Sequence, residues 1–223
     1  MQEHLKKLLH FKALTGSKAY GLAIETSDDD WRGFYVPSTT DWFRLSEPIE
    51  QLETTKVEDY AYWEVRKFLQ LVLKNNPNVL ESLWSPVIEY PHPATEQIIR
   101  EYIENERKNI LSKKIIKTYG GYATSQLKRG EEYVARGKTK DGWKHLMHLC
   151  RLLIQGKQAL LTGELKVNVG EYKDRLLDIR NEKMSMDDFK KWHTELELEF
   201  NDAQAKTPLP ARPDPTVPEQ FLI

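Results

Sequence analysis

The fold is decided by the stretch Gly16-Ser17-Lys18-Ala19-Tyr20-Gly21-Leu22-Ala23-Ile24-Glu25-Thr26-Ser27-Asp28-Asp29-Asp30-Trp31-Arg32-Gly33. It concentrates glycine, hydroxyl and carboxylate groups more tightly than any other part of the sequence. The run 11–15 before it is expected to form a strand, and residues 30–36 are expected to form another. A glycine after a strand lets backbone N–H groups approach a phosphate, and a hydroxyl adds a donor. The stretch therefore predicts a phosphate-facing turn between two strands.

Two aspartates near the end of this stretch are candidate metal ligands. Side chains two apart on a strand share a face, so Asp28 and Asp30 would point the same way and Asp29 the other. Two carboxylates on one face can hold Mg²⁺, which prefers oxygen ligands and substrate phosphates. The alternative is an acidic surface turn. Because Gly16-Ser17 stands twelve residues ahead of Asp28, we favour a site of phosphoryl or nucleotidyl transfer.

The pattern Gly16-Ser17, a ten-residue spacer and Asp28-x-Asp30 resembles the signature of the DNA polymerase β-like nucleotidyltransferase superfamily. With Arg32-Gly33, the fuller string looks most like the branch of predicted nucleotidyltransferases associated with RNA repair. One departure is Asn181-Glu182, where the branch would have a glycine soon after the arginine. The likeness continues through Lys67-Phe68, Asn76-Pro77-Asn78-x-Leu80-Glu81-x-Leu83, Lys144-His145-x-x-His148-x-x-Arg151-Leu152-Leu153 and Ile179-Arg180.

The resemblance implies transfer of a nucleoside monophosphate from a nucleoside triphosphate to a hydroxyl, with release of pyrophosphate. Two Mg²⁺ ions would be held by Asp28, Asp30 and a third carboxylate on a later strand. Asp59 is the preferred third ligand, with Glu53 and Glu58 as rivals. The other interpretation of Asp59 is the N-cap of the helix that follows, because aspartate is favoured there.

Further residues are implied in nucleotide binding: Gly16, Ser17, Lys18 and Tyr20 near the first strand, and Lys144 and Arg151 in a later helix. In the expected helix 141–162, Lys144, His148, Arg151 and Gln155 would make a polar face opposite an apolar stripe. Cations on this face could hold the triphosphate. A solvated helix face is the alternative.

The element pattern predicts an α+β protein: a small mixed sheet with flanking helices, followed by an all-helical part. Residues 1–90 are expected to form the nucleotidyltransferase core, 91–206 a helical domain and 207–223 a proline-rich extended tail. We expect strands at 11–15, 30–36, 49–55 and around Val57 and Asp59, and a loop or turn at 38–47. In the first 90 residues we expect helices at 2–10, 18–24, about 60–73, and 79–84 after an Asn78 cap. Beyond them we expect helices at 93–106, 111–136 with an interruption at Gly120-Gly121, 141–162, 171–181 and 186–205.

Composition adds little about partners. The formal net charge of the 223 residues is −1, which gives no global argument for nucleic acid or for an anionic membrane. With one cysteine, Cys150, no apolar signal segment and no apolar window of about 18 residues, we expect a cytoplasmic protein without a membrane partner. The oligomeric state is not predicted.

The acceptor is left open among an RNA end, which is favoured, a protein hydroxyl and a small molecule. A binding module of the same fold without turnover is the alternative function. One expected helix carries cations that could contact an RNA backbone or form a solvated face: Lys113, Lys114, Lys117, Lys128 and Arg129. Tyr119 and Tyr122 on the same helix are expected in the core rather than in base stacking.

Overall fold

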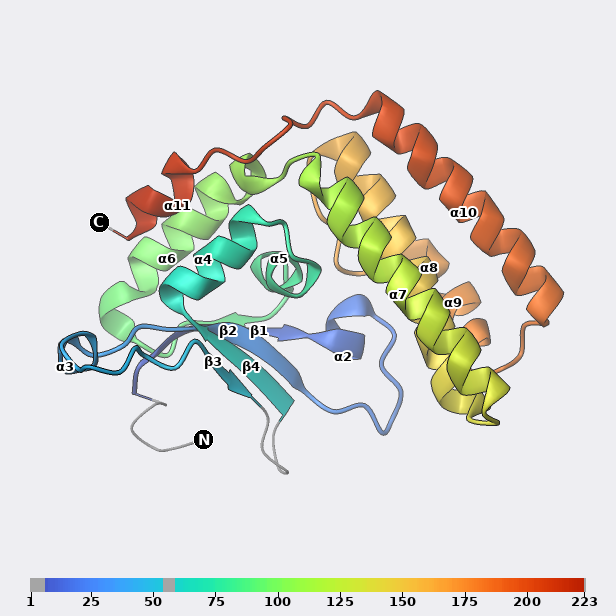
Figure 1. Ribbon diagram of the computed structural model, residues 1–223, viewed down its shortest axis with the longest axis horizontal. Coiled ribbons are helices and arrows are strands. Elements are labelled where there is room, and N and C mark those ends of the chain that lie inside the picture. Colours follow the sequence, from blue (N-terminus) through green and yellow to red (C-terminus); the bar gives the residue numbers. More distant parts are fainter. Residues whose placement is uncertain (1–6, 54–58, 223) are drawn as a thin grey trace. The chain divides into compact units, whose positions relative to one another are not determined.

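The computed structural model describes residues 7–53 and 59–222, which divide into two compact units (Figure 1). The first unit extends to Ile110 and includes the segment from Pro213 onward, and the second runs from Leu111 to Arg212. The division falls later than the expected boundary at residue 90, because the helix at 93–106 packs with the first unit. A mixed sheet together with many helices confirms the α+β class.

The described residues of the first unit form a five-stranded sheet in the order β3-β4-β2-β1-β5. Strand β1 pairs antiparallel with β2, and β2 pairs parallel with β4. The expected strand at 30–36 is confirmed, since β2 covers nearly all of it. The strands are β1 (Leu9–Thr15), β2 (Asp30–Tyr35), β3 (Gln51–Glu53), β4 (Asp59–Glu64) and β5 (Ile88–Glu89).

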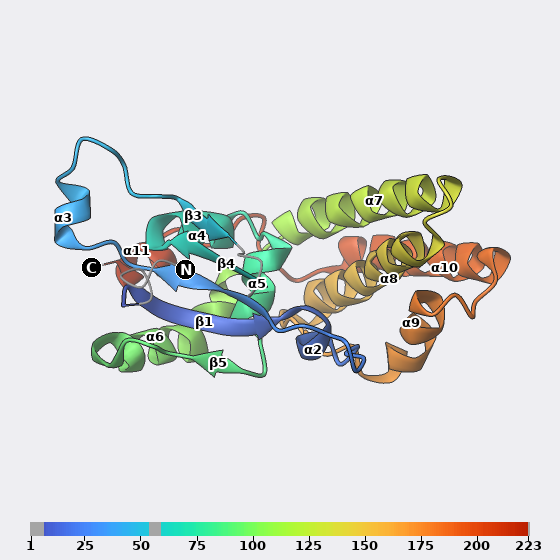
Figure 2. The ribbon, with the colours of Figure 1, turned by 90° about the horizontal axis from the view of Figure 1, so that it is seen from below.

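Helices α4 (Val65–Leu73), α5 (Pro77–Leu83) and α6 (Pro93–Glu106) contact the strands, and Figures 1 and 2 show them around the sheet. The rings of Phe11, Phe34 and Phe68 meet between the sheet and α4, with centroids 5.1 to 5.8 Å apart. All three are at most 3% exposed. Burying a phenylalanine contributes about 1.5–3 kcal/mol, so this cluster is a main source of stability.

The segments around the first and fourth strands differ from the sequence prediction. Residues 7–10 of the expected helix 2–10 do not form it, since β1 begins at Leu9, and residues 2–6 lie outside the described part. The expected helix from residue 60 is wrong as far as Glu64, because β4 occupies that segment and pairs with β2. Glu64, rather than Asp59, caps the helix: its carboxylate accepts from the backbone N–H groups of Arg66 and Lys67.

Three shorter predictions also need correction. The short helix α5 is capped by Asn76, whose side chain accepts from the N–H of Asn78, so Asn78 is not the cap. The helix expected at 18–24 is instead α2 (Gly16–Tyr20), which follows β1 directly. The expected loop after β2 contains a short helix, α3 (Thr39–Trp42), closed by a capping box from Ser38.

The proline-rich tail is not extended throughout, as was expected, because residues 216–221 form helix α11 (Thr216–Phe221). This helix belongs to the first unit. The ring of Phe221 lies 5.8 Å from that of Phe34 and 4.6 Å from that of Tyr102, so the end of the chain completes the aromatic core. Burial of this aromatic side chain offsets the entropy lost on ordering the segment.

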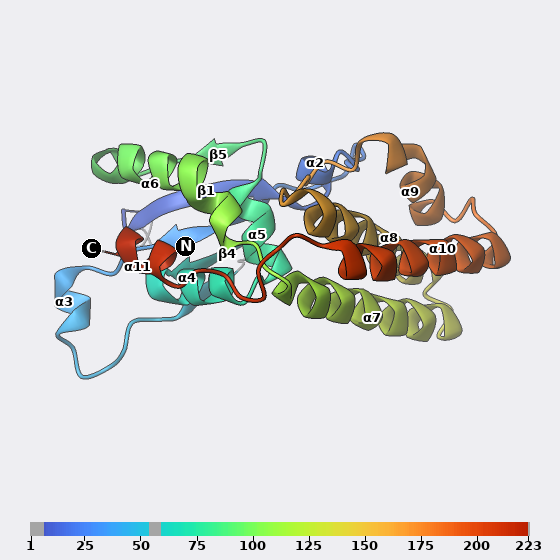
Figure 3. The same ribbon diagram turned by 90° about the horizontal axis from the view of Figure 1, so that it is seen from above.

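The second unit is helical, and Figure 3 shows its long helices side by side. Its two longest helices are joined by a short turn and pack closely. Gly120 and Gly121 do not interrupt the first of them, contrary to expectation. The helices are α7 (Lys114–Ala135), α8 (Thr139–Thr162), α9 (Lys173–Arg180) and α10 (Met186–Lys206). Across the described ranges, no helix combines the length and apolar character needed to cross a membrane.

Candidate active site

The backbone at Gly16 lies against the side chain of Asp30. Gly16 follows the last residue of β1 and has a φ of +67°, a conformation that L side chains rarely adopt. A Cβ atom placed there would lie 1.8 Å from Oδ2 of Asp30. Thr15, the register partner of Asp30, donates its hydroxyl to the carbonyl oxygen of Asp30 at 3.0 Å. The glycine turn and the aspartate therefore form one structural unit.

A second carboxylate stands beside Asp30 on the neighbouring strand. Asp30 and Asp59 are register partners in the parallel pair of β2 and β4, so their side chains share a face of the sheet. Neighbouring strands lie about 4.8 Å apart, which brings the two carboxylates within reach of one cation. Asp59 is therefore placed on a strand next to Asp30, as the sequence prediction required.

A cation accompanies this pair of carboxylates. Nη1 of Arg32 lies 3.6 Å from Oδ1 of Asp59 and donates to the carbonyl oxygen of Trp31 at 2.9 Å. Arg32 is two residues beyond Asp30, so it shares the carboxylate face. Arg32 was expected only as part of the family string and had no predicted role. Its spacing from Asp30 was the signal that could have assigned it to the site.

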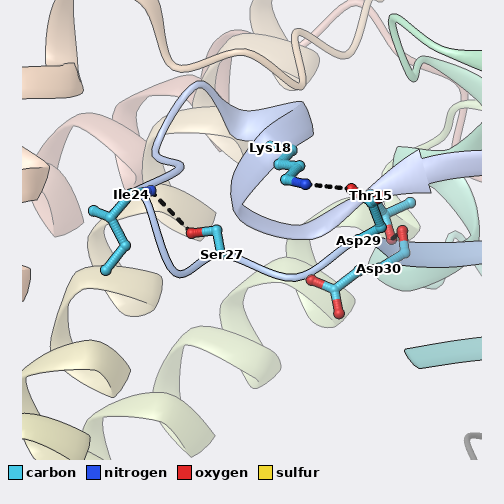
Figure 4. Close-up of polar contacts among 6 residues, drawn as sticks. All are labelled: Thr15, Lys18, Ile24, Ser27, Asp29 and Asp30. Carbon is cyan, nitrogen blue, oxygen red and sulfur yellow. Dashed lines mark hydrogen bonds and ion pairs between the residues drawn. The ribbon is translucent and has the colours of Figure 1, made fainter. Parts of the chain in front are cut away.

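The other two aspartates, Asp28 and Asp29, lie in the loop that leads into β2. Figure 4 shows Asp29 in this loop. Asp28 is exposed. Asp29 was expected to form the turn or to face solvent. Its Oδ1 forms an ion pair with Nζ of Lys18 at 2.5 Å. Farther along the loop, the N–H of Ile24 donates to the hydroxyl of Ser27 at 2.9 Å, which closes a tight turn. Lys18 thus connects the helix after β1 to the loop before β2.

The donor set fits Mg²⁺ in part. Within residues 7–53 and 59–222, no three His, Cys, Asp or Glu side chains gather closely enough to hold a metal ion. Asp28, Asp30 and Asp59 are thus not gathered into a preformed cluster, and their shared role as metal ligands stays a prediction. Mg²⁺ is commonly held by one or two carboxylates together with substrate phosphates and water, so Asp30 and Asp59 are a sufficient pair.

Four of the predicted nucleotide contacts, Gly16, Ser17, Lys18 and Tyr20, lie in helix α2, and all but Lys18 are at least partly buried. Ser17 is half-buried, and its carbonyl oxygen accepts from the N–H of Leu22 at 2.8 Å. Tyr20 is 7% exposed and donates its hydroxyl to Oε2 of the buried Glu81 at 2.5 Å. The Tyr20 hydroxyl therefore holds α2 against α5 in the core, where it does not meet a solvent-borne nucleotide.

The predicted contacts in the second unit differ from each other in exposure. Lys144 is exposed and lines a hollow of 360 Å³ together with His145, His148 and Tyr133. Arg151 is only 6% exposed and donates to Oε1 of Gln155 at 2.6 Å. These two residues of the expected polar face of α8 are buried, so the alternative of a solvated face does not hold for them.

The surroundings of two histidines of this hollow lower their pKa values. Burial holds the pKa of His148 well below its usual value, and the charges of Arg151 and Lys144 lower it further. Burial and the charges of Arg129 and Lys144 lower the pKa of His145. Burial is the larger cause for both histidines, and Asp141, which also lines the hollow, partly offsets the effect of the cations on His145.

The structure has a glycine turn facing a strand carboxylate, with a second carboxylate on the parallel neighbour, in an α+β protein. The chain belongs to the family described as RlaP, the RNA repair pathway DNA polymerase beta family, whose model matches residues 1–221. The family resemblance expected from the sequence is thereby confirmed.

A curated relative is the "Uncharacterized protein YcgL" of Bacillus subtilis (strain 168). The two are 34% identical over 89 residues, which is 39% of this chain and 34% of the relative. The match thus spans about a third of the relative's length. No solved structure matches the chain.

Proposed function

We propose that the protein is a Mg²⁺-dependent nucleotidyltransferase that moves a nucleoside monophosphate from a nucleoside triphosphate to a hydroxyl group. The observation that carries this proposal is the contact between the Gly16 backbone and the carboxylate of Asp30, with Asp59 beside it in the sheet. Membership of a polymerase β-like family supports the same chemistry.

In this proposal, Asp30 and Asp59 hold Mg²⁺, and the exposed Asp28 supplies a third carboxylate from the loop before β2. When bound, the metal would lower the pKa of the acceptor hydroxyl and balance the charge on the phosphates. Asp59, if it is the carboxylate nearest the acceptor, would also take the hydroxyl's proton. Arg32 restrains the Asp59 carboxylate through their ion pair.

The backbone at Gly16 and the hydroxyl of Ser17 are the proposed contacts for the β- and γ-phosphates. Lys18 holds the loop through Asp29 and adds a positive charge nearby. Lys144, exposed in its hollow, is the proposed phosphate contact of the second unit. Arg151 is buried, so we propose that it acts through its charge rather than by direct contact. Tyr20 is left out because its hydroxyl bonds to Glu81.

The acceptor we favour is an RNA end, because the family is described as one of RNA repair. A module that binds nucleotide or RNA without turnover is the second candidate. Asp30 and Asp59 favour catalysis, since adjacent carboxylates can hold the Mg²⁺ that the transfer requires.

The test is incubation of the purified protein with each α-³²P-labelled nucleoside triphosphate, Mg²⁺ and either RNA, protein or a metabolite extract. Label is expected on RNA and to depend on Mg²⁺. Label on a protein or a small molecule would change the acceptor and keep the reaction class. Absence of transfer to all three, with nucleotide binding retained, would contradict the proposal and leave the binding module.

A further inference from the structure

One face of helix α7 carries a hollow that the proposed reaction does not use. Its volume is 550 Å³, within the range of small-ligand sites, and it lies in the second unit. Its lining side chains recur about every four residues, so they follow one face of the helix for about 18 Å. They include Lys117, Gly121, Tyr122, Ser125, Gln126 and Arg129.

The charge of this face suits a polyanion. Lys117 and Arg129 stand at its two ends, and both are exposed. Among the described residues, no carboxylate lines the hollow. Gln126 also lines the neighbouring hollow that holds Lys144, and its Oε1 lies 2.6 Å from Nδ1 of His145. Gln126 therefore lines both hollows, and each hollow has an exposed cation in its lining, although Asp141 also lines the hollow of Lys144.

Gly121 has no role in packing that would account for it. It lies in the interior of a 22-residue helix, where glycine lowers helix stability relative to alanine. A Cβ atom placed there would meet no atom within 4 Å among the described residues, and Gly121 is exposed. A glycine that leaves the backbone bare on a ligand-facing surface is typical of a site where a ligand approaches closely.

An aromatic ring lies next to this bare backbone. Tyr122 is half-buried, so it is not the core residue expected from the sequence, whereas Tyr119 is fully buried. Aromatic rings interleaved with cations are the usual surface for single-stranded nucleic acid, because bases stack on the ring and phosphates pair with the cations.

We propose that this face of α7 binds single-stranded RNA, with phosphates at Lys117 and Arg129, a base on Tyr122 and the chain passing over Gly121. The proposal rests on the proposed function in one respect: the bound strand would be the acceptor. An RNA strand that follows α7 from Lys117 to Arg129 would lead toward the hollow of Lys144, where the phosphates of a nucleotide are proposed to bind.

The test is the affinity of the full chain for a fluorescein-labelled single-stranded RNA of about ten nucleotides, measured by anisotropy in EDTA at several salt concentrations. The double variant Lys117→Ala/Arg129→Ala should bind more weakly, with the slope of log K against log salt reduced by about 1.4. Tyr122→Ala should lose about tenfold in affinity. The matched control is Lys190→Ala/Lys191→Ala, which removes two exposed charges from α10 and should change neither value.

Gly121→Ala separates this role from a structural one. The alanine should raise Tm by about 2–4 °C and weaken RNA binding at the same time. A rise in Tm with unchanged affinity, or equal losses in the α7 and α10 double variants, would overturn the proposal. Because binding is measured without Mg²⁺ or nucleotide, and Asp30→Asn should retain it, failure of the catalytic proposal is distinguished from failure of this one.

Discussion

Gly16 and Asp30, fourteen positions apart, are in contact: the space that a Cβ of Gly16 would occupy is filled by the carboxylate of Asp30. The register of β1 and β2 creates this contact, because Thr15 lies opposite Asp30. The turn that would receive a phosphate and the carboxylate that would bind a metal are therefore held by the same pair of strands.

Gly16→Ala is predicted to abolish transfer while leaving most of the protein folded. The substitution adds a left-handed penalty of about 1–2 kcal/mol and forces the Asp30 side chain to move. The matched control is Gly137→Ala, where φ is +74° but no atom lies within 4 Å of the added Cβ. Thermal unfolding should show the left-handed penalty in both variants, with a further loss at Gly16 from the displaced Asp30, and activity should be lost only at Gly16. Equal activity in the two would contradict a role for the close approach.

Tyr20→Phe is predicted to destabilise the protein and to leave nucleotide affinity unchanged. The variant removes the hydrogen bond to the buried Glu81, which should lower the free energy of unfolding by about 1–3 kcal/mol. Denaturant unfolding and the apparent KM for nucleotide are measured on the same preparation. A raised KM with unchanged stability would restore the nucleotide-binding role expected from the sequence.

Lys144→Glu is predicted to raise the apparent KM for nucleotide, because it reverses a charge in a hollow where burial and nearby cations lower the pKa of two histidines. Lys140→Glu is the control, since Lys140 is exposed on the same helix and does not line the hollow. The expected rise is about tenfold, equivalent to one lost charge-assisted contact. If both variants shift KM alike, the effect is one of net charge alone.

Acid is predicted to destabilise the first unit through His10. This side chain is 9% exposed, stacks on His92 at 4.3 Å and has Nδ1 2.8 Å from Oγ1 of Thr95. Burial, with a smaller effect of His92, lowers the pKa of His10 from 6.5 to about 4.

Between these two pKa values the unfolded chain binds the proton and the folded chain does not. Stability is therefore complete above the unfolded pKa of 6.5 and falls as the pH drops toward 4. His10→Gln should reduce the fall in Tm between about pH 7 and pH 4.5. An identical fall in variant and wild type would show that His10 does not contribute.

Local sequence patterns predicted much of the fold, but they failed where apolar residues fit both the helical and the strand periodicity. Tyr62, Val65 and Phe68 recur at helical spacing, which suggested a helix beginning at residue 60. Tyr60 and Tyr62 also alternate at the strand period, and pairing of β4 with β2 decides the outcome through Glu64. Leu9 was assigned to a helix for the same reason, although alternation through Phe11 continues into β1.

The candidate site was predictable where its residues lie close together in the sequence. Gly16 and Asp30 follow from a turn between two strands, and Asp59 followed from a family pattern that the parallel register explains. Burial of Tyr20 and Arg151 was not predictable, because each depends on a segment brought near by the fold. Glu81 from α5 meets Tyr20, and the carbonyl oxygen of Val167 accepts from Gln155, the helix neighbour of Arg151.

The most direct measurement is Mg²⁺-dependent transfer of label from α-³²P nucleoside triphosphate by Asp30→Asn beside Asp29→Asn. Both substitutions remove one negative charge from adjacent positions, but only Asp30 lies against Gly16 and beside Asp59. We predict that Asp30→Asn loses at least about 100-fold in transfer and that Asp29→Asn retains activity near that of the wild type. Wild-type transfer by Asp30→Asn, or equal losses in the two variants, would contradict the proposed metal site.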